Sequence, residues 1–181
     1  MYTVAVVVGS LRKASINKKL ARALEKTGND LFTFTHVDIS SLPLYNQDFD
    51  GNIPAPVLAM KEIVAAADAV LFVTPEYNRS IPGVLKNALD SGSRPYGENV
   101  WAGKPAAMAG SSGGAVGTAV AQSHLRSVAG FLGMRLTVQP ELYFQDKPGL
   151  LEDDGTVTDE RTRQYLRAFL TSFNEWIDKV R

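Results

Sequence analysis

The feature that most constrains the fold is a continuous apolar run, Val4–Val8, followed by a polar loop and then a helical pattern. A strand that is apolar at every position is typical of a parallel sheet covered on both faces. Beyond the loop, apolar residues recur at helical spacing: Ile16, Leu20, Ala23 and Leu24. The loop 9–17 therefore leads from a buried strand into a helix.

The loop 9–17 has the composition of a phosphate-binding loop. Helix N-termini present unpaired backbone N–H groups and a partial positive charge, which suit an anion. Ser10, Ser15 and Asn17 would add side-chain donors, and Arg12 would add a charged one. An ordinary strand-to-helix turn, in which Ser15 only caps the helix, explains the same residues. Taken alone, this loop leaves both interpretations open.

Strand and helix patterns alternate along the rest of the chain. An edge strand is predicted over 31–39, where apolar and polar residues alternate. Buried strands are predicted over 69–73, over 105–109 and at Leu136 and Val138. Helices are predicted around Met60–Ala67, Val84–Leu89, Val120–Leu132 and Leu166–Ile177, with a polar connection over 144–159. Five strands that alternate with helices predict a three-layer α/β fold, and right-handed crossovers leave few topologies for it. Its five-stranded parallel sheet is expected in the flavodoxin-like order 2-1-3-4-5.

Composition narrows the classes of protein. A chain of 181 residues with 45% hydrophobic residues is expected to form one domain over 1–181. Nineteen basic and nineteen acidic residues give no general attraction to nucleic acid or to a membrane surface, so the expected partner is a small molecule. No cysteine is present for disulfides or thiolate chemistry. Without a leader or a membrane-length apolar run, the expected location is the cytoplasm.

Three unusual loops, 9–17, 74–82 and 110–117, follow the predicted first, third and fourth strands of the sheet. The carboxyl ends of parallel strands meet at one edge, where open α/β sheets bind ligands. We therefore expect the three loops to form one binding site.

The second loop is stiffened by Pro75 and Pro82, which lowers the cost of ordering it around a ligand. Backbone N–H groups between them would meet the edge of a flat heterocycle. Glu76 is a conceivable general acid, although a surface carboxylate is the simpler interpretation. Tyr77 and Asn78 are equally consistent with plain turn residues.

The third loop matches G-x-S-x-G, the pattern of a hydrolase nucleophile elbow, at Gly110, Ser112 and Gly114. A triad would need an acid and then a histidine, but no acidic residue lies between Ser112 and His124. His36 and His124 lack the spacing of a metal site and are taken as structural. Neither a Walker loop nor a Rossmann fingerprint occurs. The glycines are better explained by backbone amides that approach a ligand.

Four motifs together resemble the NADPH-dependent FMN reductase family: GSLRKASIN, LPLYNQD, TPEYNRSIPGVLKNALD and GKPAAMAGSSGG. Its members include bacterial quinone, chromate and azo-dye reductases, and the resemblance extends from the first strand to about Phe144. It implies bound FMN, NADPH or NADH as the electron donor, and a small-molecule acceptor. By the family pattern, the phosphate would be held by Ser10, Arg12, Ser15 and Asn17. The edge of the isoalloxazine ring of FMN would be lined by Pro75, Glu76, Tyr77 and Asn78. The pyrimidine end of this ring would lie near Ser111, Ser112 and Gly113.

The expected function is two-electron reduction of quinones, with no protein residue required as a catalyst because flavin carries the chemistry. A flavodoxin-type electron carrier and a reductase that releases reduced FMN are the alternatives. No contact is assigned to Arg79. A homodimer or homotetramer is expected, partly because 93–104 contains Pro95, Tyr96, Val100 and Trp101, an apolar set suited to association. A loop folded onto its own subunit is the alternative.

Overall fold

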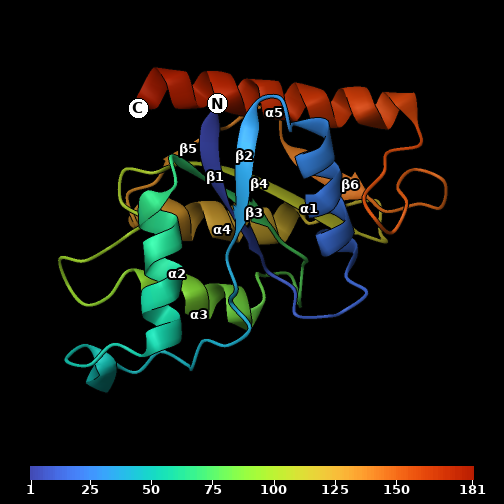
Figure 1. Cartoon of the computed structure of the whole chain (residues 1–181). Helices are drawn as coiled ribbons and strands as arrows, with labels where there is room; N and C mark the ends of the chain where they lie inside the picture. Colours follow the sequence, from blue (N-terminus) through green and yellow to red (C-terminus); the bar gives the residue numbers. More distant parts are fainter.

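A computed structural model describes all 181 residues and shows a six-stranded parallel sheet between two helical layers (Figure 1). The strands are β1 (Tyr2–Val8), β2 (Phe32–His36), β3 (Ala69–Val73), β4 (Pro105–Ser112), β5 (Arg135–Leu136) and β6 (Leu142–Gln145). They follow the order β2-β1-β3-β4-β5, with β6 also paired to β4. The predicted flavodoxin-like order is confirmed, and β2 is the edge strand expected from its alternation.

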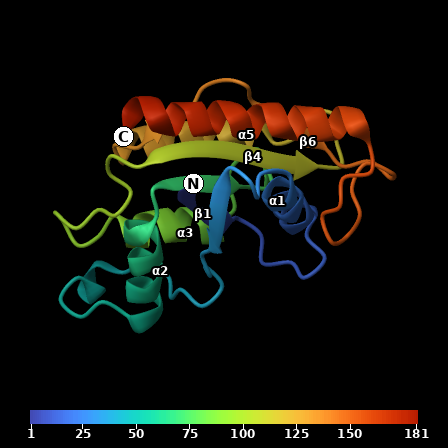
Figure 2. The ribbon, with the colours of Figure 1, turned by 45° about the horizontal axis from the view of Figure 1, so that its top comes forward.

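The helices are α1 (Ile16–Thr27), α2 (Ala55–Ala66), α3 (Gly83–Gly92), α4 (Ala119–Phe131) and α5 (Glu160–Val180), with a short 3₁₀ helix at Gln47–Phe49. Figure 2 shows β4 between α5 on one face of the sheet and α3 on the other. None of these helices has the length and apolar character needed to cross a membrane.

Two hydrophobic clusters hold the layers together and explain why β1 is apolar at every position. Val4, Val6 and Val8 belong to the cluster with α1 and α5. Ala5 and Val7 belong to the cluster with α2, α3 and α4. Because β1 is central, both sets of alternating side chains are buried, as a doubly covered parallel strand requires.

The predicted last strand at Leu136 and Val138 is wrong in extent. Only Arg135–Leu136 pairs with β4, and Val138 is 65% exposed. The edge continues as β6, which pairs with the carboxyl end of β4 and lies partly in the stretch predicted as a polar connection. Pro140 stands between the two strands and lacks the N–H that a continuous ladder would need.

Trp101 corrects the expectation that 93–104 offers an apolar surface as a whole. Its side chain is fully buried, and its ring nitrogen donates a hydrogen bond to the Leu89 carbonyl at 3.0 Å. Gly92 makes room for the ring, since a Cβ there would lie 2.5 Å from the indole nitrogen. Tyr96, by contrast, is 93% exposed. The loop is therefore folded onto its own subunit through Trp101 and leaves Tyr96 at the surface.

Candidate functional site

The first loop is a run of backbone donors with no acceptor in the chain. The Gly9 N–H donates to the Val73 carbonyl at 2.9 Å, which fixes the loop to the end of β3. The N–H groups of residues 10–16 donate no hydrogen bond within the chain. Successive unpaired N–H groups at a helix N-terminus form an anion-binding cradle.

Side chains around the cradle favour an anion as well. The first turn of α1 contains no acidic residue, and Arg12 is exposed with neither an ion pair nor a hydrogen bond. Ser15 is the N-cap of α1, because its hydroxyl oxygen accepts from the backbone N–H groups of Asn17 and Lys18. The capping interpretation of Ser15 is thus confirmed, and its hydroxyl hydrogen is still available to an anion.

Asn17 connects the first loop to the third. Its side-chain nitrogen donates to the Ser111 carbonyl at 2.9 Å, and its side-chain oxygen accepts from the Ser111 N–H at 2.8 Å. Both residues are about 1% exposed. The amide of Asn17, expected from the sequence to contact phosphate, is occupied in holding β4 against the start of α1.

Glu76 connects the second loop to α4. One of its carboxylate oxygens accepts from the N–H groups of Val120 and Ala121, each at 3.1 Å. The other oxygen lies 3.1 Å from the Arg79 guanidinium, and only 10% of the Glu76 side chain is exposed. A carboxylate at this position satisfies two unpaired donors and offsets the positive end of the helix dipole. The structure therefore gives Glu76 a capping role, neither a general acid nor a free surface carboxylate.

The Glu76 cap was not predicted from the sequence, and the N-cap position of α4 is occupied by Thr118, a common capping residue. The Thr118 side chain makes no cap hydrogen bond, and its oxygen instead accepts from the Gln122 side chain at 3.0 Å. No local pattern signals a cap that comes from a loop 44 residues earlier.

The second loop contains a tight two-residue turn. Tyr77 and Ser80 exchange backbone hydrogen bonds at 2.9 and 3.0 Å, and Asn78 and Arg79 between them have φ of 50° and 63°. Two consecutive left-handed residues are the mark of a type I′ turn. The N–H groups of Glu76, Asn78 and Arg79 donate no hydrogen bond within the chain. The turn interpretation is thus confirmed, and it leaves donors for a ligand.

The third loop has a buried hydroxyl without a partner. Ser111 is 1% exposed, and its side-chain oxygen makes no hydrogen bond in the chain. Ser112 forms a local turn with Gly114, while a Cβ on Gly113 would meet nothing within 4 Å. A buried hydroxyl without a partner in the chain is the kind of group that a bound ligand satisfies.

Gly110 lets the second and third loops approach closely. A Cβ at this position would lie 1.9 Å from the Thr118 hydroxyl and 2.4 Å from the Thr74 carbonyl oxygen. Only glycine fits there. Two further contacts near this loop were not expected, Gln145 to the Gly113 carbonyl at 3.3 Å and Lys19 to Asp146 at 2.8 Å. Both contacts involve β6 or the residue after it, and the sequence pattern did not predict a strand there.

The three loops lie in line along the sheet, because β1, β3 and β4 are consecutive in its order. The anion cradle is at one end of this line, and the unpaired donors of the second and third loops lie next to it in that order. This arrangement suits a ligand with a terminal phosphate and a flat polar ring, which are the two ends of FMN. Fold and site together define a flavodoxin-like protein equipped for a flavin mononucleotide.

Comparison with known proteins agrees with this class. The sequence profile of the family described as NADPH-dependent FMN reductase matches residues 2–149, and the chain belongs to this family. It is 51% identical to a 2-hydroxy-1,4-benzoquinone reductase of a Burkholderia species, over 96% of this chain and 95% of the relative. It is 46% identical to a quinone reductase of Pseudomonas putida, over 98% and 95% of the two chains.

A solved structure is also closely similar. FerB of Paracoccus denitrificans, described as a flavoenzyme NAD(P)H:(acceptor) oxidoreductase, superposes with a TM-score of 0.96 at 45% identity. The match covers 99% of each chain. The similarity therefore includes α5, which lies outside the region matched by the family profile.

Proposed function

We propose that this chain is an FMN-dependent NAD(P)H oxidoreductase that reduces quinones and similar small acceptors. The observation that carries the proposal is the run of unpaired N–H groups over 10–16 at the start of α1, beside the unpaired Arg12. Bound FMN supplies hydride acceptance from the nicotinamide and electron transfer to the acceptor. The protein then needs only to bind the FMN, orient it and shield it from water, and no side chain needs to react.

Each site residue has a role in this proposal that follows from its contacts. Ser10, Arg12 and Ser15, with the backbone of the loop, hold the phosphate. Asn17 and Glu76 hold the three loops in register, since their side chains are already bonded across loops.

The flat ring is proposed to lie against the second and third loops. Pro75, Tyr77 and Asn78 line one edge, where the N–H groups of Glu76, Asn78 and Arg79 are unpaired. The pyrimidine end faces Ser111, Ser112 and Gly113, where the Ser111 hydroxyl lacks a partner. Donors at this end stabilise negative charge that develops on the reduced ring.

The nicotinamide and the quinone are proposed to use one site in turn. The fold contains a single sheet with no second nucleotide-binding sheet, and the Burkholderia and Pseudomonas putida relatives are named for quinone reduction. A shared site requires that the oxidised nicotinamide leaves before the acceptor enters. The proposal therefore includes a ping-pong order of substrates.

Initial rates with NADPH and a benzoquinone, varied together, test the proposal. Parallel lines in double-reciprocal plots are expected. Intersecting lines would rule out the shared site. The same assay with and without added FMN separates the alternatives, since a carrier shows no NADPH oxidation alone and a reductase that releases reduced FMN requires added flavin.

The whole chain, 1–181, is proposed to act as one FMN-binding domain. Residues from both ends of the chain, such as Val4 and Ile177, lie in one hydrophobic cluster. A cytoplasmic location is part of the proposal because the pyridine nucleotide donor is a cytoplasmic metabolite.

A homodimer, or a homotetramer built from it, is also proposed. Phe131 at the end of α4 is 91% exposed, and Tyr96 is 93% exposed. The Asn99 side chain donates to the Leu132 carbonyl at 3.0 Å, which brings the 93–104 loop beside the end of α4. Exposed aromatic side chains on neighbouring segments favour association.

A further inference from the structure

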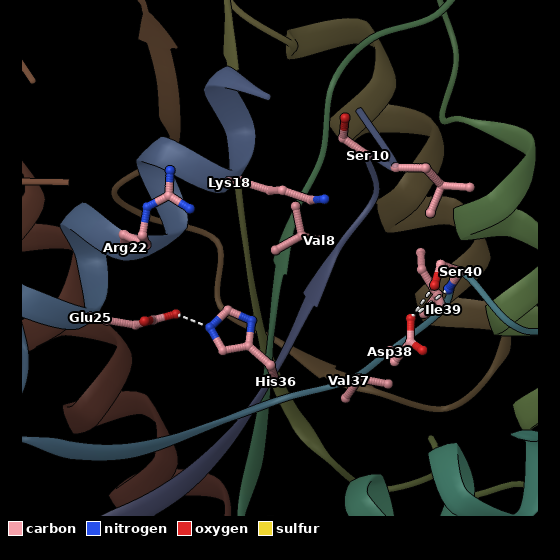
Figure 3. Close-up of a pocket in the computed structure, with 11 residues that line it drawn as sticks. Val8, Ser10, Lys18, Arg22, Glu25, His36, Val37, Asp38, Ile39 and Ser40 are labelled. Carbon is pink, nitrogen blue, oxygen red and sulfur yellow. Dashed lines mark hydrogen bonds and ion pairs between the residues drawn. The ribbon is translucent and has the colours of Figure 1, made fainter. Parts of the chain in front are cut away.

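A pocket lies beside the first loop, outside the carboxyl ends of β1 and β2 (Figure 3). Its volume is about 540 Å³, and its polar lining consists of Ser10, Lys18, Arg22, Glu25, His36, Asp38 and Ser40; we name it the β1–β2 crevice. Small-molecule pockets commonly have volumes of this size. Since β1 stands between β2 and β3 in the sheet, the crevice and the second and third loops lie on opposite sides of the phosphate cradle.

The acidic groups of the crevice already have partners. Glu25 Oε1 lies 2.6 Å from His36 Nε2. Asp38 accepts from the Ser40 backbone N–H at 2.8 Å and from the Ser40 hydroxyl at 2.6 Å. Glu25 is therefore paired with His36, whereas Asp38 keeps its negative charge and is held by hydrogen bonds from Ser40.

The basic groups that α1 contributes to the crevice, Lys18 and Arg22, are not within ion-pair distance of any carboxylate. Lys18 makes no ion pair or side-chain hydrogen bond in the chain, and Figure 3 shows its side chain extending from α1 across the crevice. Arg22, one turn further along α1, donates to the backbone carbonyl of Asp153 at 2.6 Å and has no carboxylate partner. Two cations on one helix face, neither of them in an ion pair, suit a phosphate group, and Asp38 is the one nearby carboxylate without a cation partner.

The other polar groups suit a sugar. The side chains of Asp38 and Ser40 line the same crevice as the two cations and offer carboxylate and hydroxyl oxygens. Such oxygens can accept hydrogen bonds from ribose hydroxyls. A phosphorylated ribose therefore matches the crevice better than inorganic phosphate alone.

We propose that the β1–β2 crevice binds the 2′-phosphorylated adenosine end of NADPH, with Lys18 and Arg22 pairing with the 2′-phosphate. This inference rests on the proposed function, because that function brings the nicotinamide end to the flavin ring at the same edge of the sheet. A dinucleotide is longer than FMN by a nucleotide and reaches past the phosphate cradle. NADH lacks the 2′-phosphate, so the crevice selects NADPH over NADH.

The test compares both donors on FMN-loaded enzyme carrying Lys18→Gln, alone and with Arg22→Gln. Each lost charge-assisted hydrogen bond is expected to raise KM for NADPH about tenfold, with kcat and KM for NADH unchanged. Calorimetric binding of 2′,5′-ADP to the holoprotein should weaken in parallel. Lys179→Gln, which removes an exposed lysine near the end of α5, is the control and should change neither.

Three outcomes would overturn the inference: unchanged KM for NADPH, equal changes for NADPH and NADH, or competition by inorganic phosphate as strong as by 2′,5′-ADP. The last would mean a general anion site. A parent enzyme that oxidises neither donor would contradict the proposed function itself. That result is distinguishable from failure of the crevice, since the crevice variants compare two donors that the parent enzyme uses.

Discussion

The Glu76 carboxylate lies 3.1 Å from the backbone nitrogen of Val120, so a residue of the second loop caps the helix that follows the third. The same oxygen accepts from Ala121, and Asn17 makes the corresponding connection between the first and third loops. Loops that follow different strands would otherwise move independently. Two buried or nearly buried polar side chains hold the cofactor edge as one unit.

Glu76→Ala is expected to weaken both the fold and FMN binding. Loss of a helix cap typically lowers the free energy of unfolding by about 0.5–2 kcal/mol. Glu76→Gln, which keeps an acceptor oxygen without the charge, should lie between the parent and the alanine variant. Urea unfolding of the apoprotein measures the first effect, and FMN titration by fluorescence measures the second. An alanine variant equal to the parent in both would show that the cap does not position the loops.

Arg12→Ala is expected to weaken FMN binding at least about tenfold, because one or two charge-assisted hydrogen bonds to phosphate are lost. Riboflavin, which has no phosphate, should bind the parent and the variant alike. Arg161→Ala is the matched control, since Arg161 is also exposed and has no ion pair. Unchanged FMN affinity in Arg12→Ala would place the phosphate elsewhere.

The Glu25–His36 pair is expected to make stability depend on pH. The hydrogen bond to Glu25 raises the pKa of His36, although partial burial and Arg22 oppose the rise. Because the folded pKa lies above the unfolded one, the pair stabilises fully below about pH 6.5 and loses this effect as the pH rises through the folded value.

Melting temperatures of the parent and of His36→Gln, measured between about pH 6 and pH 9, test this sign. The advantage of the parent should be greatest at the acid end and should shrink toward the alkaline end. Glu25→Gln should remove the same pH-dependent difference. A parent advantage that grows with pH would mean that His36 is stabilised in its neutral form.

Phe131→Ser is expected to weaken self-association, since it replaces a 91% exposed aromatic side chain. Sedimentation at micromolar concentration should show a dimer or tetramer for the parent and a smaller species for the variant. Val138→Ser changes another exposed apolar residue, two positions after the end of β5, and should leave the mass unchanged. A monomeric parent would remove the oligomer from the account.

The sequence was informative where local chemistry decides the structure. The run Val4–Val8 indicated a central strand, Gly9 marked the start of the first loop, and Ser15 was open to interpretation as the cap of the helix that follows. Contacts between distant segments were not visible, because neither the Asn17–Ser111 pair nor the Glu76 cap has a local pattern. The environment of Trp101 could not be predicted either, because the sequence does not distinguish an apolar loop residue that packs into the core from one that contacts a partner. The β1–β2 crevice joins residues of α1 to residues after β2, which only the fold brings together.

The central claim, that this chain carries FMN and uses it to pass electrons from NAD(P)H to quinones, is tested most directly by an anaerobic titration. The purified protein, loaded with FMN, is followed by its visible absorption as NADPH and then a benzoquinone are added. We expect bleaching by one equivalent of NADPH and full return of the colour with one equivalent of quinone. A yellow protein that NADPH does not bleach, or a protein that binds no FMN, would contradict it.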